Sequence, residues 1–116
     1  MPLSFEQCTS ILKDHLNLEE LNHGVAYAAE TPIPIGEQLR FPRIMMDVPW
    51  PAYLAFADRE PQANWGHPCR YILINRETGE VASYEARFPP FKTGIDIHWR
   101  VVYKAKGVPD SALAVR

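Results

Sequence analysis

His67 and Cys69 are the residues whose types and spacing could most directly carry out chemistry. They stand two positions apart across Pro68, so on an extended strand both side chains would point to the same side. An imidazole beside a thiol can lower the pKa of that thiol and make it a nucleophile, and the same two groups can ligate a metal ion. The alternative is that Cys69 faces the core while His67 closes the preceding loop. A zinc ion would need further ligands, and the other His and Cys residues show no paired spacing. We therefore expect no metal site and no cofactor.

Asp58 and His98 are further candidates for a catalytic role. A carboxylate can act as a general acid or base when burial shifts its pKa, whereas most charged loop residues form only local ion pairs. An enzyme would bring at least two of Asp58, His67, Cys69 and His98 within hydrogen-bond reach in a closed pocket.

Trp50 and Trp65 occupy loops flanked by proline or glycine. Aromatic side chains in loops often anchor partner proteins, because they bury a large area at a low entropic cost. Together with Arg59 and His67 they form the candidate partner-binding surface. The alternative is that both tryptophans seal the ends of a sheet.

The composition limits the class of protein. With 116 residues, 47% of them apolar and 22% charged, the chain is expected to form one globular domain, 1–116. A formal net charge of −2 argues against nucleic-acid binding. No apolar run approaches the roughly 20 residues of a membrane span, and the first residues lack signal-peptide features, so we expect a cytoplasmic protein without membrane contact. We expect Cys8 and Cys69 to be free, buried thiols.

Residues 69–88 predict a β-hairpin around which the rest of the chain is organised. An apolar run, 71–74, is followed by the turn residues 75–79 and by a second extended segment. Gly79 is placed to take the positive φ angle that such a turn requires. Ser4 and Gln7 have the spacing of a helix capping box, and apolar residues then recur at helical spacing.

These patterns predict an α+β fold in which one N-terminal helix packs on a curved antiparallel sheet. We expect the helix over about 5–16, or to 22 if a further turn forms before Gly24. The expected strands are about 25–29, 43–48, 53–57, 69–75, 80–88 and 95–104, with a loosely docked tail over 105–116. The last strand shows a strict alternation over 95–103, in which Ile95, Ile97, Trp99, Val101 and Tyr103 alternate with Asp96, His98, Arg100 and Val102, and this indicates one buried face.

The segment from Tyr71 to Val81, with its Thr-Gly turn after an apolar strand, resembles the hairpin of PepSY-like modules and protease propeptides of the cystatin-like group. The resemblance covers the hairpin region only. It implies a non-enzymatic module that binds or restrains a partner protein, often a peptidase. The Gln-x-Val-x-Gly segment of the cystatin inhibitors is absent from the sequence.

Three functional hypotheses remain open from the sequence. The first is a non-enzymatic module that binds a protein or peptide, in a propeptide-like or peptidase-inhibitor-like role. The second is a small enzyme or small-molecule-binding protein that uses the concave face of the sheet. The third is a homo-oligomer formed through a free sheet edge, at the strand ending near Tyr103 or the one near Tyr53.

Overall fold

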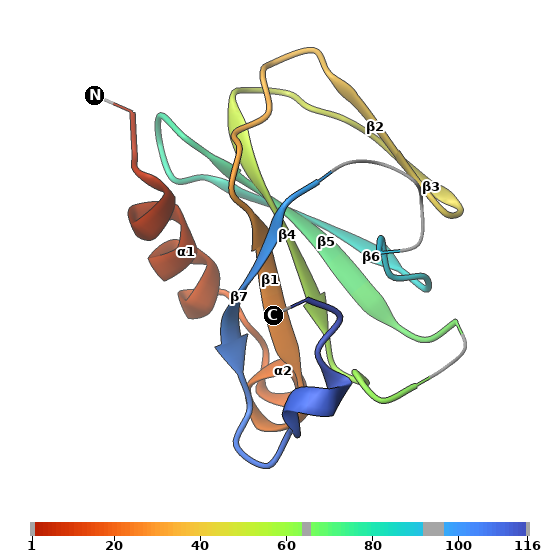
Figure 1. Ribbon diagram of the computed structural model, residues 1–116. Coiled ribbons are helices and arrows are strands. Elements are labelled where there is room, and N and C mark those ends of the chain that lie inside the picture. The colour runs from red at the N-terminus through yellow and green to blue at the C-terminus, as the bar shows by residue number, and fades with distance from the viewer. Residues whose placement is uncertain (1, 64–65, 92–96, 116) are drawn as a thin grey trace.

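A five-stranded antiparallel sheet with the order β6-β5-β4-β1-β7 forms the centre of the computed structural model, which describes residues 2–63, 66–91 and 97–115 (Figure 1). A separate hairpin pairs β2 with β3. The helices are α1 (Phe5–Asp14), α2 (Leu18–His23) and the 3₁₀ helix η1 (Asp110–Ala112). The strands are β1 (Val25–Ala29), β2 (Gln38–Phe41), β3 (Ile44–Asp47), β4 (Ala52–Asp58), β5 (Cys69–Asn75), β6 (Val81–Ala86) and β7 (Trp99–Lys104). The α+β class and the N-terminal helix packed on an antiparallel sheet are confirmed.

Two capping boxes divide the N-terminal region into two helices. Ser4 accepts a hydrogen bond from the backbone N–H of Gln7, and the Gln7 side chain accepts one from the backbone N–H of Ser4, as the sequence predicted. Asn17 and Glu20 repeat this arrangement at the start of α2. The chain therefore leaves the first helix after Asp14 and begins a second one, rather than extending one helix to residue 22.

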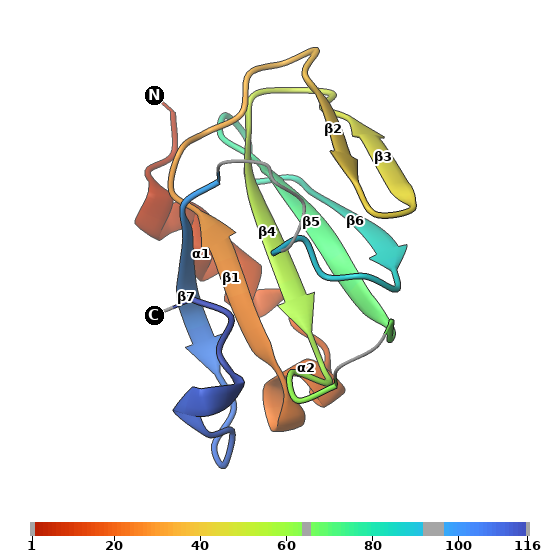
Figure 2. The ribbon, with the colours of Figure 1, turned by 45° about the vertical axis from the view of Figure 1, so that its right-hand side comes forward.

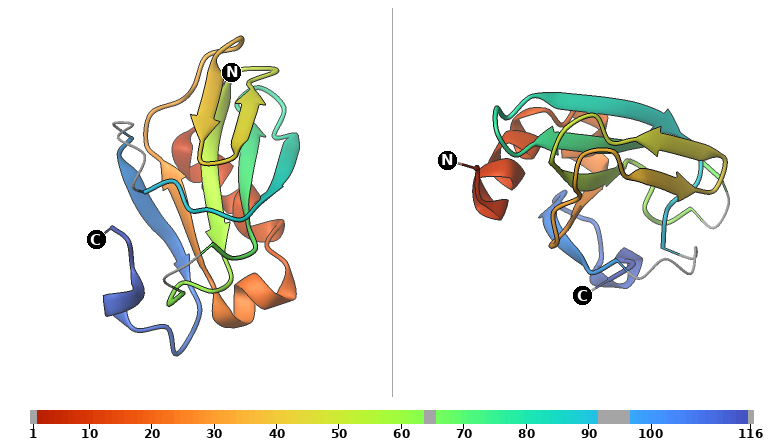
Figure 3. Two further views of the ribbon diagram at one scale, coloured as in Figure 1. Left: turned by 90° about the vertical axis from the view of Figure 1, so that its right-hand side faces the viewer. Right: turned by 90° about the horizontal axis from the view of Figure 1, so that it is seen from above.

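Both faces of the sheet are covered, and this explains why β1, β4 and β5 read as apolar runs rather than as alternating patterns. The views in Figures 2 and 3 show α1 on one face and the β2–β3 hairpin on the other. The core on the α1 side comprises Cys8, Leu12, Leu16, Ala26, Ala28, Tyr53, Ala55, Ala57, Ile72 and Ile74. The core on the hairpin side includes Tyr27, Leu54, Phe56, Tyr71 and Leu73 of the sheet, Leu39, Phe41 and Met46 of the hairpin, and Val108.

The hairpin predicted over 69–88 is present as β5 and β6. Gly79 has a φ of +81°, and its N–H donates to the carbonyl of Asn75 at 2.8 Å. The side chain of Asn75 accepts hydrogen bonds from the N–H groups of Glu77 and Thr78 in the same turn. The turn residues thus supply their own hydrogen bonds, and this fixes the register in which β5 and β6 pair.

Several boundaries differ from those expected. β2 was not predicted as a strand. β3 and β6 are shorter than 43–48 and 80–88, and β4 is longer than 53–57. Within the range 95–104, residues 95–96 lie outside the described residues and the strand begins at Trp99. The expected alternation is present over 97–101, where Ile97, Trp99 and Val101 are partly buried and His98 and Arg100 are exposed. It ends at an irregularity in the pairing with β1, where Val102 packs against the core on the α1 side.

The C-terminal segment is not loosely docked. Ala105 and Val108 are buried in the core, and the N–H of Ala114 donates to the hydroxyl of Tyr27 at 3.1 Å. The strand containing Tyr53 is central, so it offers no free edge. The edges of the five-stranded sheet are β6 and β7. None of the helices in the described ranges is long and apolar enough to cross a bilayer.

Candidate functional site

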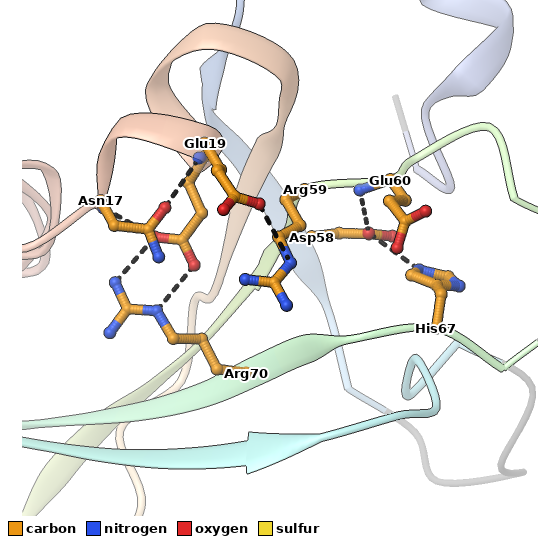
Figure 4. A network of polar contacts seen from close by, with 8 residues as sticks. Asn17, Glu19, Asp58, Arg59, Glu60, His67 and Arg70 are labelled. Atoms are coloured by element: carbon orange, nitrogen blue, oxygen red, sulfur yellow. Dashed lines mark hydrogen bonds and ion pairs between the residues drawn. The ribbon is translucent and has the colours of Figure 1, made fainter.

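The candidate site is a buried pair formed by Asp58, the last residue of β4, and His67, which lies just before β5 (Figure 4). The Nε2 atom of His67 donates to Oδ1 of Asp58 at 2.8 Å. The two side chains are 2% and 8% exposed. The backbone N–H of His67 donates to the carbonyl of Arg87 at 2.7 Å, which fixes the segment before β5 against the chain that leaves β6. Asp58 is therefore fixed by its place at the end of β4, and His67 by its backbone hydrogen bond to Arg87.

Burial dominates the electrostatics of Asp58. The pKa of its carboxyl is raised because burial disfavours the charged form, while the N–H of Glu60 and the imidazole of His67 act in the opposite direction. Oδ1 accepts both of these hydrogen bonds, from Glu60 at 2.9 Å and from His67 at 2.8 Å. The carboxyl is thus oriented firmly while its charge is only partly compensated.

A cavity of about 640 Å³ has this pair in its wall. Its lining is otherwise apolar and aromatic, and comprises Tyr27, Pro42, Pro61, Ala63, Gly66, Phe88, Pro89, Phe91, Ala112 and Ala114. The rings of Tyr27 and Phe91 meet edge to face, with their centroids 4.7 Å apart. The burial that raises the pKa of the Asp58 carboxyl raises that of the Tyr27 hydroxyl as well. Most lining side chains are therefore apolar, and Asp58, His67 and the hydroxyl of Tyr27 are the polar ones among them.

Cys69 lies beside the pair but is not activated by it. It stands directly opposite Asp58 in the pairing of β4 with β5 and is 3% exposed. Its pKa is raised to about 12, first by burial and then by the negative charges of Asp58 and Glu85. The imidazole does not lower this pKa below its usual range, and Cys69 faces the core, as in the alternative interpretation of the sequence. Cys8 and Cys69 are both free and buried, as expected.

His98 is not brought to the site. Trp99, the next residue, pairs with Ala29 at one end of β1, whereas Asp58 pairs with Val25 at the other end. At about 3.4 Å per residue, the length of β1 separates the two positions by more than 10 Å. The structure therefore brings together Asp58, His67 and Cys69, with the bonded contact between the first two.

The structure describes three of the four residues predicted to bind a partner. Trp50 is half-buried against the core on the hairpin side, and Trp65 lies outside the described residues. Arg59 forms an ion pair with Glu19, with 3.6 Å between Nε and Oε2. His67 is buried, so its side chain offers no surface to another protein in this conformation.

A second buried carboxylate, Glu20, was missed by the sequence analysis. Its two oxygens accept hydrogen bonds from Nε and from a terminal nitrogen of Arg70, both at 2.7 Å. Arg70 also donates to the carbonyl of His15 and to the hydroxyl of Ser83. The capping-box spacing of Asn17 and Glu20 could have indicated α2, but nothing in the sequence links Glu20 to an arginine 50 positions later.

A second cavity, of about 460 Å³, lies beside α2 and the segment after β7; its lining includes His23, Glu60 and Lys106, which carry mixed charge. No cluster of three or more His, Cys, Asp or Glu side chains suited to a metal ion occurs in the described part of the chain. Comparison with protein-family models, with curated proteins and with solved structures finds no match to this chain. The site must therefore be interpreted from its own geometry.

Proposed function

We propose that the protein binds a small organic molecule in the cavity beside Asp58 and His67. The observation that carries the proposal is the position of a buried, hydrogen-bonded Asp–His pair in the wall of a cavity whose other lining side chains are mostly apolar. Binding sites for small molecules are typically concave spaces of about 300–1,000 Å³ with apolar walls and a few fixed polar groups. A volume of about 640 Å³ lies within that range.

Two further features support binding rather than covalent catalysis. The one thiol near the pair, Cys69, has a pKa raised to about 12, so it is protonated near neutral pH. The polar atoms of the pair are held by backbone groups as well as by each other, which gives a ligand fixed points of attachment. Such preorganisation lowers the entropic cost of binding.

A cavity-filling variant tests this function. Ala112→Phe places a ring in the cavity, whereas Ser111→Phe adds the same ring at the neighbouring exposed position, which does not line it. A library of small molecules is screened against both variants and the natural chain by ligand-observed NMR. We expect compounds that bind the natural chain and Ser111→Phe but not Ala112→Phe, and circular dichroism checks that both variants are folded.

Nuclear Overhauser effects between a bound compound and the ring of Phe91 in the natural chain provide a second readout that needs no variant. Binding that is unchanged in Ala112→Phe and shows no effect at Phe91 would contradict the proposal. A screen in which no compound binds the natural chain at millimolar concentration would contradict it too.

A second candidate function is binding of a protein or peptide, including a propeptide-like or peptidase-inhibitor-like role. It is supported by exposed apolar side chains, Ile35 at 63% and Met45 at 58%, before and within the β2–β3 hairpin. The order of a helix followed by an antiparallel sheet is compatible with the cystatin-like group that the 71–81 hairpin resembles. Edge strands β6 and β7 leave room for pairing with another chain, a second copy included.

Met45→Ser and Ile35→Ser test the second candidate without disturbing the core. A partner that uses this surface would be retained on immobilised natural protein and lost from the double variant. Sedimentation of the natural chain at several concentrations checks self-association through β6 or β7. A monomer that retains no protein or peptide would contradict the second candidate and leave the cavity as the functional feature.

A further inference from the structure

The charge of the cavity wall restricts the chemistry of a ligand. Of the described lining residues, Asp58 is the one with a carboxyl group and His67 the one with an imidazole, and neither lysine nor arginine is among them. An anionic ligand would therefore meet a buried carboxyl with no lysine or arginine in the described lining to offset its charge, which is costly at low dielectric. A cationic ligand could instead pair with the carboxylate of Asp58.

Asp58 also has an oxygen available for a ligand. Both of its hydrogen bonds are accepted by Oδ1, and no residue in the described ranges donates to Oδ2. Among the same residues, Nε of Arg76 is the one fully buried side-chain N or O atom that lacks a partner. Oδ2 is therefore not sealed in the core; it borders open space, and Asp58 lines the cavity.

The aromatic lining favours the same ligand charge. Tyr27, Phe88 and Phe91 contribute rings to the wall. The face of an aromatic ring attracts a cation, and more strongly when water is excluded. The guanidinium of Arg43 already lies 5.5 Å from the ring centroid of Phe88, so Tyr27 and Phe91 are the rings that remain for a ligand. A ligand with an apolar body and a cationic end would thus find a surface for each part.

We infer that the cavity selects a small primary amine carried on an apolar or aromatic body, with its ammonium group paired to Oδ2 of Asp58. This inference rests on the proposed function, since it names the class of ligand for the same cavity. Burial raises the pKa of the Asp58 carboxyl, so a cation beside it supplies the compensation that His67 and the N–H of Glu60 leave incomplete.

Three probes with one common body test the inference: 2-phenylethylamine, 2-phenylethanol and 3-phenylpropanoate. Their affinities are measured by protein-observed NMR titration at neutral pH. We expect the amine to bind at least about tenfold more tightly than the alcohol, because hydrogen bonds between charged groups are stronger than those that involve a neutral hydroxyl. The carboxylate should bind most weakly.

Two variants distinguish a direct ion pair between the ammonium group and Asp58 from a general attraction of the cation to negative charge. Asp58→Asn should reduce the affinity for the amine to about that for the alcohol. Glu60→Gln removes the same formal charge from an exposed side chain that does not line this cavity, and should change the affinity less than about twofold. If the Asn variant does not fold, the ¹³C shift of the Asp58 carboxyl during the amine titration reports the pairing in the natural chain.

The outcomes distinguish the two proposals. If the alcohol binds as tightly as the amine and contacts Phe91, the cavity binds small molecules but the selection for a cation is wrong. Equal losses in Asp58→Asn and Glu60→Gln would overturn direct pairing. A ¹³C chemical shift of the Asp58 carboxyl that does not change during the amine titration would also overturn direct pairing. If neither these probes nor any library compound binds, the proposed function itself fails.

Discussion

Two buried carboxylates on opposite faces of the sheet show how differently one chain can accommodate the same chemical group. Glu20, 3% exposed, uses both oxygens: Arg70 donates to each, and the N–H of Asn17 donates to one. Asp58 is 6% exposed, and among the described residues it accepts hydrogen bonds through Oδ1 alone. Figure 4 shows the Arg70 and His67 arrangements side by side.

The difference separates a structural charge from a candidate functional one. The guanidinium of Arg70 matches the geometry of a carboxylate, and its hydrogen bond to Glu20 raises its own pKa. Its further bonds to the carbonyl of His15 and the hydroxyl of Ser83 tie the helices to β5 and β6. Nothing remains for a ligand there. Asp58 has one oxygen toward open space and a cavity beside it, which is the arrangement a binding site needs.

Arg70→Met should have the largest effect on stability. Removing one member of a buried pair leaves the other charge without compensation, which typically costs about 3–5 kcal/mol. We expect a loss of that order in the free energy of unfolding, measured by urea denaturation. The matched control is Arg100→Met, because Arg100 pairs with Glu30 in the open, with 53% and 45% of the side chains exposed. That change should cost about 0–1 kcal/mol.

The double variant Glu20→Gln with Arg70→Met removes the uncompensated charge and should recover part of the loss. Equal destabilisation by Arg70→Met and Arg100→Met would mean that the buried ion pair of Glu20 and Arg70 does not stabilise the fold more than a surface pair does. The distinction between Glu20 as a structural carboxylate and Asp58 as a functional one would then be wrong.

Most of the fold could be predicted from the sequence, because the local sequence patterns agree with the packing of the whole chain. The Ser4 capping box, the Gly79 turn and the apolar runs at β1 and β5 each have a local physical cause, and each is present. β2 was missed because its burial alternates over only four residues and depends on pairing with β3. The C-terminal segment was misjudged because its burial comes from contacts with Tyr27, far away in the sequence.

The candidate site could be predicted only in part from the sequence. Asp58, His67 and Cys69 were named as candidates, but their roles depend on burial, which raises the pKa of a thiol that an adjacent imidazole could have lowered. Strand pairing places Asp58 opposite Cys69, and the loop then returns His67 to Asp58. The ion pair of Glu20 and Arg70 joins helix to strand across 50 positions, and no short motif encodes such a contact.

Gly24→Ala should have the next largest effect, because Gly24 lies between the two carboxylate residues. A Cβ atom there would stand 2.6 Å from the backbone oxygen of Asp58 and 2.9 Å from that of Glu20. Backbone atoms must move to admit it, and overpacking of this kind typically costs about 1–3 kcal/mol. We expect a lower free energy of unfolding and shifted NMR signals for the His67 ring.

The control for this change is Gly107→Ala, where nothing lies within 4 Å of the added atom although φ is +94°. It should cost backbone strain alone and leave the His67 signals in place. Unshifted His67 signals in Gly24→Ala would show that the site tolerates movement at the end of β4.

The pH dependence of stability should distinguish Asp58 from an ordinary surface carboxylate. Its pKa is raised by burial above 3.8, so the folded protein retains this proton to higher pH than the unfolded chain. As the pH rises from about 3.8 through the raised pKa, the contribution of Asp58 to the free energy of unfolding therefore falls. The difference in unfolding free energy between the natural chain and Asp58→Asn should decrease over this interval in urea titrations. A difference that grows with pH would show that the bonds from His67 and Glu60 outweigh burial.

Arg59→Met should have the smallest effect, and this makes it informative. Arg59 follows Asp58 in the chain and links the loop to Glu19 of α2, but the atoms are 3.6 Å apart and 67% of the Glu19 side chain is exposed. Such pairs contribute about 0–1 kcal/mol, and we expect less than about 0.5 kcal/mol in urea denaturation. Arg59 was also predicted to bind a partner, so this variant can lose a partner without losing its fold. A larger destabilisation would mean that the loop after Asp58 depends on this contact, and that the carboxyl of Asp58 is held from the side of α2 as well as from His67.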